Sequence, residues 1–175
     1  MKETVLISGK NGLLANRFWE LQKSKYNIKF LSTDKKKCDN TSVFYWNIKN
    51  EFIDRNALKD CDHIVHLAGY PIINRWTKEN KNKMYESRIS STKLIYKYCK
   101  KLMIEPKTFI SASAIGIYGL ESKGEKDEKD ITNTDWISKM AIDWEKSADI
   151  FKKINAKVVK MRISLIISKK SLFLK

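Results

Sequence analysis

The stretch "TVLISGKNGLLANRFWELQ", from Thr4 to Gln22, decides the fold. It begins with five residues that favour a buried strand, passes through Gly9 and Gly12, and ends in a run with helical apolar spacing. A strand, glycine turn and helix in this order open dinucleotide-binding sheets, because glycine permits the tight turn and the helix N-terminus attracts a diphosphate. The alternative is a turn that uses its glycines for geometry alone, since two glycines at this spacing are weak evidence by themselves.

Strand-like and helix-like segments alternate along the rest of the chain. The expected strands after the first are 28–32, 42–46, 63–68, 108–111 and 158–163, and the expected helices are 13–23, 54–60, 77–102 and 136–154. Thr77 is the expected N-cap of the long helix, and the polar stretch 119–135 is an expected loop. This alternation implies right-handed βαβ crossovers. The sequence therefore predicts an α/β fold with a doubly wound parallel sheet of the Rossmann type.

The net charge of +15 admits two interpretations. Clustered basic residues can bind a polyanion, but the positive charge here is almost all lysine, scattered along the chain. Lysine is accompanied by many Asn and Ile residues, a composition that an AT-rich genome produces by drift. No nucleic-acid recognition motif or Gly-aromatic platform is present. Nucleic acid is therefore not an expected partner.

Cysteine and histidine usage argues against disulfide and metal sites. Cys38, Cys61 and Cys99 are odd in number and form no CxxC pair, and His63 and His66 are isolated from other ligand types. The polar N-terminus reaches Gly9 too soon for a signal-peptide core, and no apolar run approaches the roughly 20 residues of a membrane helix. The expectation is a soluble, cytoplasmic protein with no metal and no membrane partner.

The residues after the second expected strand bear on the choice between NAD and NADP. An acidic residue at this place binds the ribose hydroxyls of NAD, whereas a basic residue accommodates the 2′-phosphate of NADP. Asp34 is followed directly by three lysines, Lys35 to Lys37. Asp34 can also be an ordinary turn residue. The cofactor is therefore predicted as NADP or NAD.

Five segments together resemble a known family. They are "LISGKNGLLANRF", "HIVHLAGYPIINRWTKENKNKMYESRISSTKLI", "FISASAIGIYG", "DWEKSA" and "VVKMRISLII". In this order they resemble the atypical extended short-chain dehydrogenases/reductases, and more narrowly the NAD(P)-dependent epimerase/dehydratase-like subgroup. The resemblance spans essentially the whole chain and implies that residues 1–175 form an NAD(P)-binding Rossmann domain that lacks most of the C-terminal substrate domain.

The resemblance implies a set of cofactor contacts at the ends of the expected strands. They are Gly9, Asn11, Gly12, Leu13 and Leu14 in the glycine turn, Ser32, Thr33 and Asp34 after the second strand, His66, Leu67, Ala68 and Gly69 after the fourth, Arg88 in the long helix and Ser111 in the fifth strand. Family members often carry Arg at or beside the position of Thr33, which suggests NADP, and this chain does not. His66 can equally be a satisfied histidine at a strand end, and Arg88 a solvated helix charge.

The catalytic pattern of the superfamily is incomplete. Ser113 fits the Ser or Thr that follows the fifth strand, but the next helix has no Tyr-x-x-x-Lys: Trp136 is followed by Met140 at that spacing. Tyr96 and Lys100 have the spacing of this motif, but they lie on the preceding helix, where a packing contact explains them better. Tyr118 remains a candidate for proton transfer, with aromatic packing as its alternative.

These features predict an NAD(P)-binding domain of an epimerase- or reductase-like protein. Its ancestral chemistry is hydride transfer at a carbonyl or hydroxyl carbon of a nucleotide-sugar-like substrate, with weak or no turnover in this chain. Members of the family continue past the sixth strand with a substrate-binding half, whereas this sequence reads "SKKSLFLK". A non-catalytic nucleotide-binding or regulatory remnant is the alternative. The substrate and the oligomeric state are left open.

Overall fold

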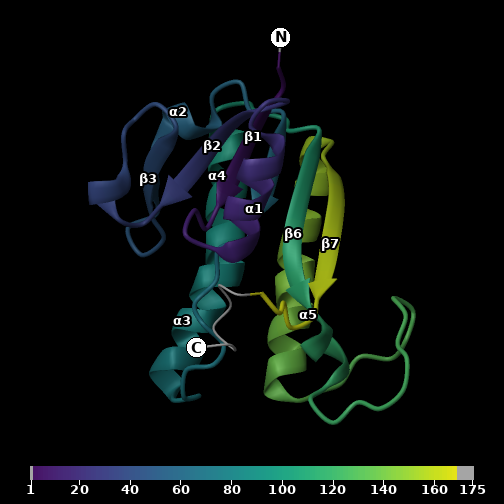
Figure 1. The fold of residues 1–175 in the computed structure, drawn as a ribbon. Helices are drawn as coiled ribbons and strands as arrows, with labels where there is room; N and C mark the ends of the chain where they lie inside the picture. Colours follow the sequence, from purple (N-terminus) through teal and green to yellow (C-terminus); the bar gives the residue numbers. More distant parts are fainter. Residues whose placement is uncertain (1, 169–175) are drawn as a thin grey trace.

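The computed structural model describes residues 2–168, which form one twisted sheet with helices on both faces (Figure 1). The strands are β1 (Thr4–Ser8), β2 (Asn27–Ser32), β3 (Val43–Asn47), β4 (Phe52–Ile53), β5 (His63–His66), β6 (Thr108–Ala114) and β7 (Lys157–Ile163). The α-helices are α1 (Leu13–Gln22), α2 (Arg55–Leu58), α3 (Lys78–Tyr85), α4 (Ser91–Lys101) and α5 (Trp136–Asp149). The shorter helical turns are η1 (Lys35–Lys37), η2 (Glu86–Ser90), η3 (Ile115–Tyr118) and η4 (Ile150–Ile154).

The strands follow the order β4-β3-β2-β1-β5-β6-β7. Every pairing is parallel except that of β3 with the edge strand β4. The chain winds outward in one direction from β1 through β2 and β3, and in the other from β5 through β6 and β7, so the strand order reverses between β1 and β5. This confirms the doubly wound Rossmann-type sheet. In such sheets ligands bind beyond the carboxyl ends of the strands at the reversal point.

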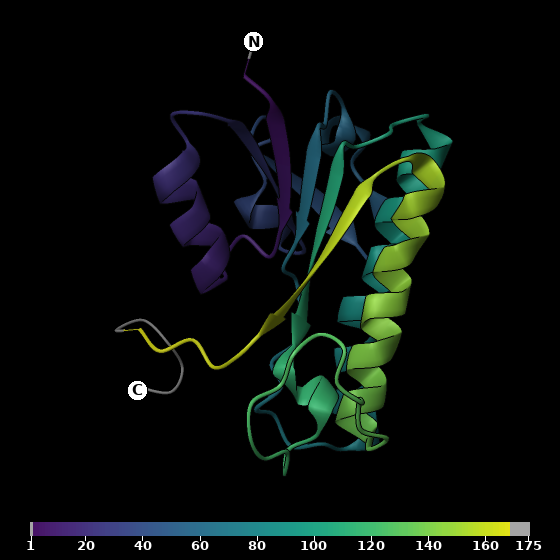
Figure 2. The ribbon, with the colours of Figure 1, turned by 90° about the vertical axis from the view of Figure 1, so that its right-hand side faces the viewer.

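The helices divide between the two faces of the sheet (Figure 2). α1 covers one face, while α4 and α5 lie side by side on the other. The larger core fills the space under α4 and α5, where the Phe109 and Phe151 rings stack with centroids 3.6 Å apart. A smaller core joins α1 to β1 and β2 through Ala15, Ile7 and Phe30. Burial of each large apolar side chain stabilises the fold by about 2 kcal/mol.

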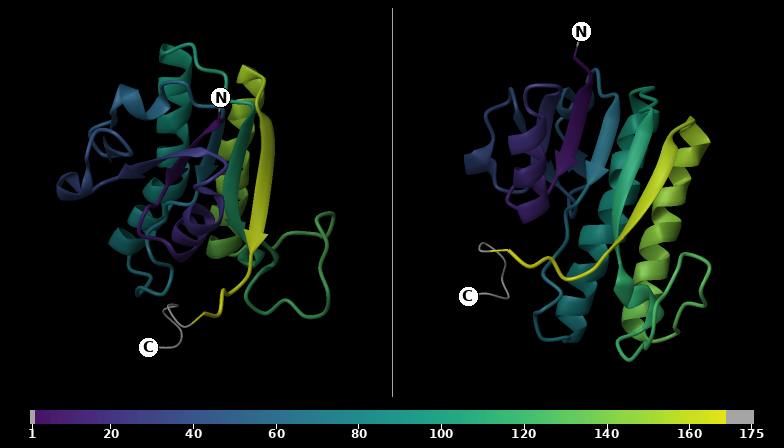
Figure 3. Two further views of the ribbon diagram at one scale, coloured as in Figure 1. Left: turned by 45° about the horizontal axis from the view of Figure 1, so that its top comes forward. Right: turned by 45° about the vertical axis from the view of Figure 1, so that its right-hand side comes forward.

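The chain runs in different directions after β6 and after β7 (Figure 3). Residues 119–135 form the expected loop, which extends past the start of α5. The described residues after β7 turn back toward the side of the sheet that carries α1. Among residues 2–168, no helix is long and apolar enough to cross a membrane.

Several expected boundaries were wrong, each for a local reason. The expected helix 77–102 is interrupted by the π-helical turn η2, although Thr77 caps it as predicted by accepting a hydrogen bond from the Asn80 amide at 3.2 Å. The expected helix 136–154 changes to the 3-10 turn η4 after Asp149. The expected strand 63–68 ends at His66, because the next two amides turn to a side chain. The two-residue strand β4 was not expected.

Candidate functional site

The turn between β1 and α1, residues 9–12, depends on glycine for its backbone conformation. Gly9 has a φ of +85°, and a Cβ there would lie 3.1 Å from the backbone nitrogen of Ala68, so only glycine fits without strain. The Gly12 amide donates to the Gly9 carbonyl at 2.8 Å, which closes the turn. Gly12 occupies the N-cap of α1 and provides no side-chain cap. The amides of the first helical turn can therefore donate hydrogen bonds to an anion.

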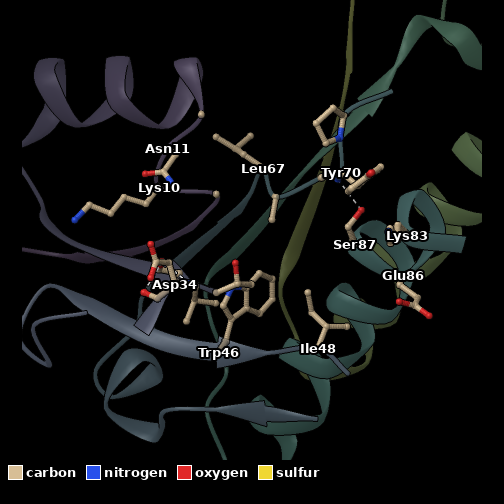
Figure 4. A pocket seen from close by; sticks show the side chains of 18 residues that line it. Lys10, Asn11, Asp34, Trp46, Ile48, Leu67, Tyr70, Lys83, Glu86 and Ser87 are labelled. Atoms are coloured by element: carbon tan, nitrogen blue, oxygen red, sulfur yellow. Dashed lines mark hydrogen bonds between the residues drawn. The ribbon is translucent and has the colours of Figure 1, made fainter. Parts of the chain in front are cut away.

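A pocket of about 490 Å³ lies in front of this turn (Figure 4). Its walls come from the carboxyl ends of β1, β2, β3 and β5 and from the α3–η2 helix. Trp46 and Ile48 extend from the end of β3 toward Leu67 on the opposite wall. The lining residues are Gly9, Lys10, Asn11, Gly12, Leu31, Ser32, Thr33, Asp34, Trp46, Ile48, Leu67, Ala68, Gly69, Tyr70, Pro71, Lys83, Glu86 and Ser87.

Nine of the expected cofactor contacts line this pocket, and five do not. The nine are Gly9, Asn11, Gly12, Ser32, Thr33, Asp34, Leu67, Ala68 and Gly69. The other five are Leu13, Leu14, His66, Arg88 and Ser111. Ser111 is fully buried within β6, where its hydroxyl donates to the Ala112 carbonyl at 2.9 Å. The structure thus brings together the turn, the end of β2 and the end of β5.

Asp34 borders the pocket while serving as the cap of a turn. Its Oδ1 accepts the Lys36 amide at 3.0 Å, and its Oδ2 lies 3.8 Å from Lys37 Nζ. The Asp34 amide in turn donates to Ser32 Oγ at 3.1 Å. Lys10 also borders the pocket, and its ammonium lies over the Phe30 ring at 5.9 Å from the centroid. One carboxylate and several ammonium groups therefore surround the end of β2.

His66 lies behind the pocket, fully buried between β1 and α4. The Ser8 hydroxyl accepts the amides of Leu67 and Ala68 at 3.0 Å each, so its own proton goes to His66 Nδ1, 2.6 Å away. This leaves the ring proton on Nε2, which donates to Ser91 Oγ at 2.9 Å. Burial lowers the pKa of His66 to about 4, so the ring is neutral. The network ties the ends of β1 and β5 to α4 and fixes the pocket floor.

Because His66 is buried as a neutral ring, we expect the protein to lose stability on acidification. Its folded pKa of about 4 lies below the value of about 6.5 in an unfolded chain. The stability that this neutral ring contributes is complete above about pH 6.5 and is lost as the pH falls toward 4, by up to about 3 kcal/mol. Urea unfolding at about pH 7.5 and about pH 5 measures this loss. The difference should shrink in His66→Gln, and an equal difference in both proteins would contradict the assignment.

The two expected catalytic residues belong to a separate polar network. Ser113 Oγ donates to Glu145 Oε1 at 2.7 Å, and Arg162 binds both oxygens of Glu145 at 2.8 and 3.1 Å. Arg162 also donates to the Tyr118 hydroxyl, which donates to the Asp127 carbonyl at 2.6 Å. Although burial opposes it, hydrogen bonding to Arg162 and Ser113 holds the pKa of Glu145 below its usual value. Neither Ser113 nor Tyr118 lines the pocket.

The positions that lack Tyr and Lys hold apolar side chains. Met140 is buried with Met84 and Trp144, and Trp136 packs against the same cluster. The sequence match at Tyr96 is a packing contact, as expected, because its ring lies edge-on to Phe151 at 5.5 Å. Within residues 2–168, no group of three or more His, Cys, Asp or Glu side chains is placed to hold a metal ion.

Sequence reasoning missed several residues that line the pocket. Trp46 and Ile48 lie at and after the end of β3, so the rule that ligands bind at the carboxyl ends of parallel strands could have identified them. Glu86 and Ser87 had no such signal, since they lie in the π-helical turn η2. The missed residues are Lys10, Leu31, Trp46, Ile48, Tyr70, Pro71, Lys83, Glu86 and Ser87.

Known proteins similar to this chain share its fold and part of its sequence. It is 29% identical over 165 residues to an epimerase family protein of Staphylococcus aureus, covering 93% of this chain and 55% of the relative. It is 28% identical over 166 residues to one of Mycobacterium bovis, covering 94% and 54%. The chain thus spans about half the length of the curated relatives it matches.

Solved structures share the fold of this chain. A nucleoside-diphosphate sugar epimerase from Corynebacterium glutamicum superimposes with a TM-score of 0.76 at 25% identity, covering 93% of this chain and 34% of the other. A human epimerase family protein solved with NADPH gives 0.77 at 21% identity, covering 96% and 56%. A UDP-glucuronic acid 4-epimerase from Bacillus cereus solved with NAD gives 0.70 at 20%, covering 91% and 56%. The sequence model of the NAD dependent epimerase/dehydratase family matches residues 5–170, and the chain therefore belongs to that family.

Proposed function

We propose that this chain binds a dinucleotide, NADP or NAD, in the pocket at the carboxyl ends of β1, β2, β3 and β5. The observation that carries the proposal is the glycine turn before α1: residues 9–12 line that pocket, and the helix has no side-chain cap at Gly12. The two structural neighbours solved with NADPH and NAD share the fold around this position and support the same ligand class.

The pocket offers a distinct surface to each part of a dinucleotide. The diphosphate would lie against the amides that follow Gly12. Trp46 and Ile48 form the apolar wall that suits an adenine ring, and the adenosine ribose would lie near Ser32 to Asp34. The nicotinamide half would extend along Leu67 to Gly69 toward α3. When bound, the nicotinamide supplies or accepts a hydride at a carbonyl or hydroxyl carbon.

Turnover in this chain is proposed to be weak or absent. Hydride transfer needs a partner that moves a proton, and the positions of the superfamily's Tyr and Lys hold Trp136 and Met140. The hydroxyls of Ser113 and Tyr118 are engaged with Glu145 and Arg162. A nucleotide-sugar-like substrate is proposed because two of the proteins that share the fold are a nucleoside-diphosphate sugar epimerase and a UDP-glucuronic acid 4-epimerase. A non-catalytic nucleotide-binding role is the second candidate, and the apolar cluster around Met140 favours it.

Titration with NADH and NADPH, followed by nicotinamide fluorescence, tests the binding proposal. We expect a saturable signal with at least one of them. A turnover assay over a panel of UDP-sugars and simple carbonyl compounds, with cofactor present, separates the two candidates. Sustained turnover would contradict the non-catalytic role. The absence of a saturable signal with either cofactor would contradict the proposed function itself.

A further inference from the structure

Lys10 brings a positive charge into the glycine turn, between Gly9 and Gly12. Its side chain borders the pocket (Figure 4). The Lys10 ammonium lies over the Phe30 ring of β2, 5.9 Å from the ring centroid. Within residues 2–168, no carboxylate lies within ion-pair distance of this ammonium. Lys10 therefore adds a positive charge that no acidic side chain of the described chain compensates.

Asp34 lies at the end of β2, where a carboxylate bears on the choice of cofactor. Two acidic residues line the pocket, and the other, Glu86, belongs to η2 on the opposite wall (Figure 4). In a pocket for NAD, a carboxylate at the end of β2 accepts hydrogen bonds from the ribose hydroxyls. Asp34 Oδ1 already accepts the Lys36 amide at 3.0 Å, and its Oδ2 lies 3.8 Å from Lys37 Nζ. The Asp34 carboxylate thus holds η1 in place and is partly neutralised.

The other lysines near the pocket differ from Lys10. None of the three lysines of η1 lines the pocket, and the ammonium of the first, Lys35, lies over the Tyr45 ring at 4.9 Å from its centroid. Lys83 does line the pocket, but its Nζ pairs with Glu79 Oε1 at 2.6 Å. Of the two lysines in the pocket wall, Lys10 is therefore the one without an acidic partner among residues 2–168.

We propose that Lys10 makes the pocket select NADPH over NADH, because its ammonium binds the 2′-phosphate of the adenosine ribose. The proposal rests on the proposed function, in which that ribose lies near Ser32 to Asp34. The two cofactors differ only in this phosphate, which carries about two negative charges at neutral pH. An ammonium binds a phosphate as a compact point charge with three donors. Thr33 and its two neighbours carry no positive charge, so the glycine turn supplies the cation.

Dissociation constants for NADPH and NADH, measured by nicotinamide fluorescence at low and moderate salt, test the proposal. The wild type should bind NADPH at least about tenfold more tightly than NADH, and the difference should shrink as salt screens the phosphate. Lys10→Gln should weaken NADPH by about tenfold and leave NADH within about twofold, since a charge-assisted hydrogen bond to the 2′-phosphate is lost. Lys10→Arg, which keeps the charge, should retain the preference.

Three further measurements separate this contact from the charge of the chain and from the fold. Lys35→Gln removes the same charge outside the pocket, and it should keep the wild-type preference. The melting temperature of Lys10→Gln without ligand should equal that of the wild type, because Lys10 forms no ion pair with residues 2–168. Adenosine 2′,5′-bisphosphate and AMP serve as probes without the nicotinamide half. The wild type should prefer the bisphosphate, and Lys10→Gln should lose that preference.

The other outcomes overturn the proposal. Equal affinity of the wild type for the two cofactors, tighter binding of NADH, or an unchanged preference in Lys10→Gln overturns it and leaves the proposed function intact. A loss of NADPH and NADH affinity by the same factor in Lys10→Gln would assign Lys10 to the diphosphate that both cofactors share. A preference that Lys35→Gln also loses would assign it to the overall charge. A wild type that binds neither cofactor contradicts the proposed function, and the Lys10 proposal fails with it.

Discussion

Gly12→Asp is expected to weaken dinucleotide binding by at least about a hundredfold, since two effects act on the same atoms. The added carboxylate places a negative charge where the diphosphate would lie. Its Cβ would also approach the Gly9 carbonyl oxygen to 3.1 Å, which crowds the turn. The backbone at Gly12, with φ −72° and ψ 148°, is one that aspartate adopts readily.

The same substitution should not destabilise the fold. Gly12 is the N-cap of α1, where aspartate is among the preferred residues, so its capping hydrogen bond offsets the crowding at Gly9 and the melting temperature should change little. Gln22→Glu, which adds the same charge at the far end of α1, is the control and should bind NADPH and NADH as the wild type does. If Gly12→Asp binds either cofactor with wild-type affinity, the diphosphate does not lie on this turn.

Glu145→Gln is expected to lower the free energy of unfolding by about 3 kcal/mol. Glu145 is buried in the folded protein, and the Arg162 side chain is only 20% exposed. Neutralising Glu145 leaves Arg162 partly desolvated without its counter-charge, and the Ser113 hydroxyl loses a charged acceptor. Urea unfolding of the two proteins near neutral pH measures the difference.

A double-mutant cycle identifies the cause of this loss. The variant that combines Glu145→Gln with Arg162→Gln should recover part of the stability, because it removes the uncompensated charge. Glu79→Gln is the control. It breaks an ion pair between Glu79, whose side chain is 76% exposed, and Lys83, whose side chain is 45% exposed, so it should change stability little. If Glu145→Gln unfolds at the wild-type urea concentration, the contacts of Glu145 with Ser113 in β6 and Arg162 in β7 do not stabilise the fold.

The sheet could be predicted because its signals are local. Short β-favouring runs of four or five residues marked β1, β2 and β6, and the apolar spacing of Phe18 and Leu21 marked α1. The alternation of strands and helices then predicted a doubly wound parallel sheet, since crossovers between parallel strands are right-handed. The two-residue β4 carries no such pattern, because it exists only through its pairing with β3.

Only part of the pocket could be predicted, because strand ends are local features and helix irregularities are not. The turn at Gly9 and Gly12 was identified from its own residues, and the end of β5 was identified from the family resemblance. The positions of Glu86 and Ser87 depend on the π-helical turn, which an apolar period of 3.6 does not reveal. The buried state of His66 depends on Ser8 and Ser91, which lie far from it in sequence.

Backbone amide NMR with NADPH or NADH as ligand tests the central claim most directly. If the glycine turn holds the diphosphate, the largest shift changes at saturation should fall on the amides of residues 10–14, with smaller changes at residues 32–34 and 67–69. Changes confined to other parts of the chain, or amides of residues 10–14 that do not respond while ligand binds, would contradict it.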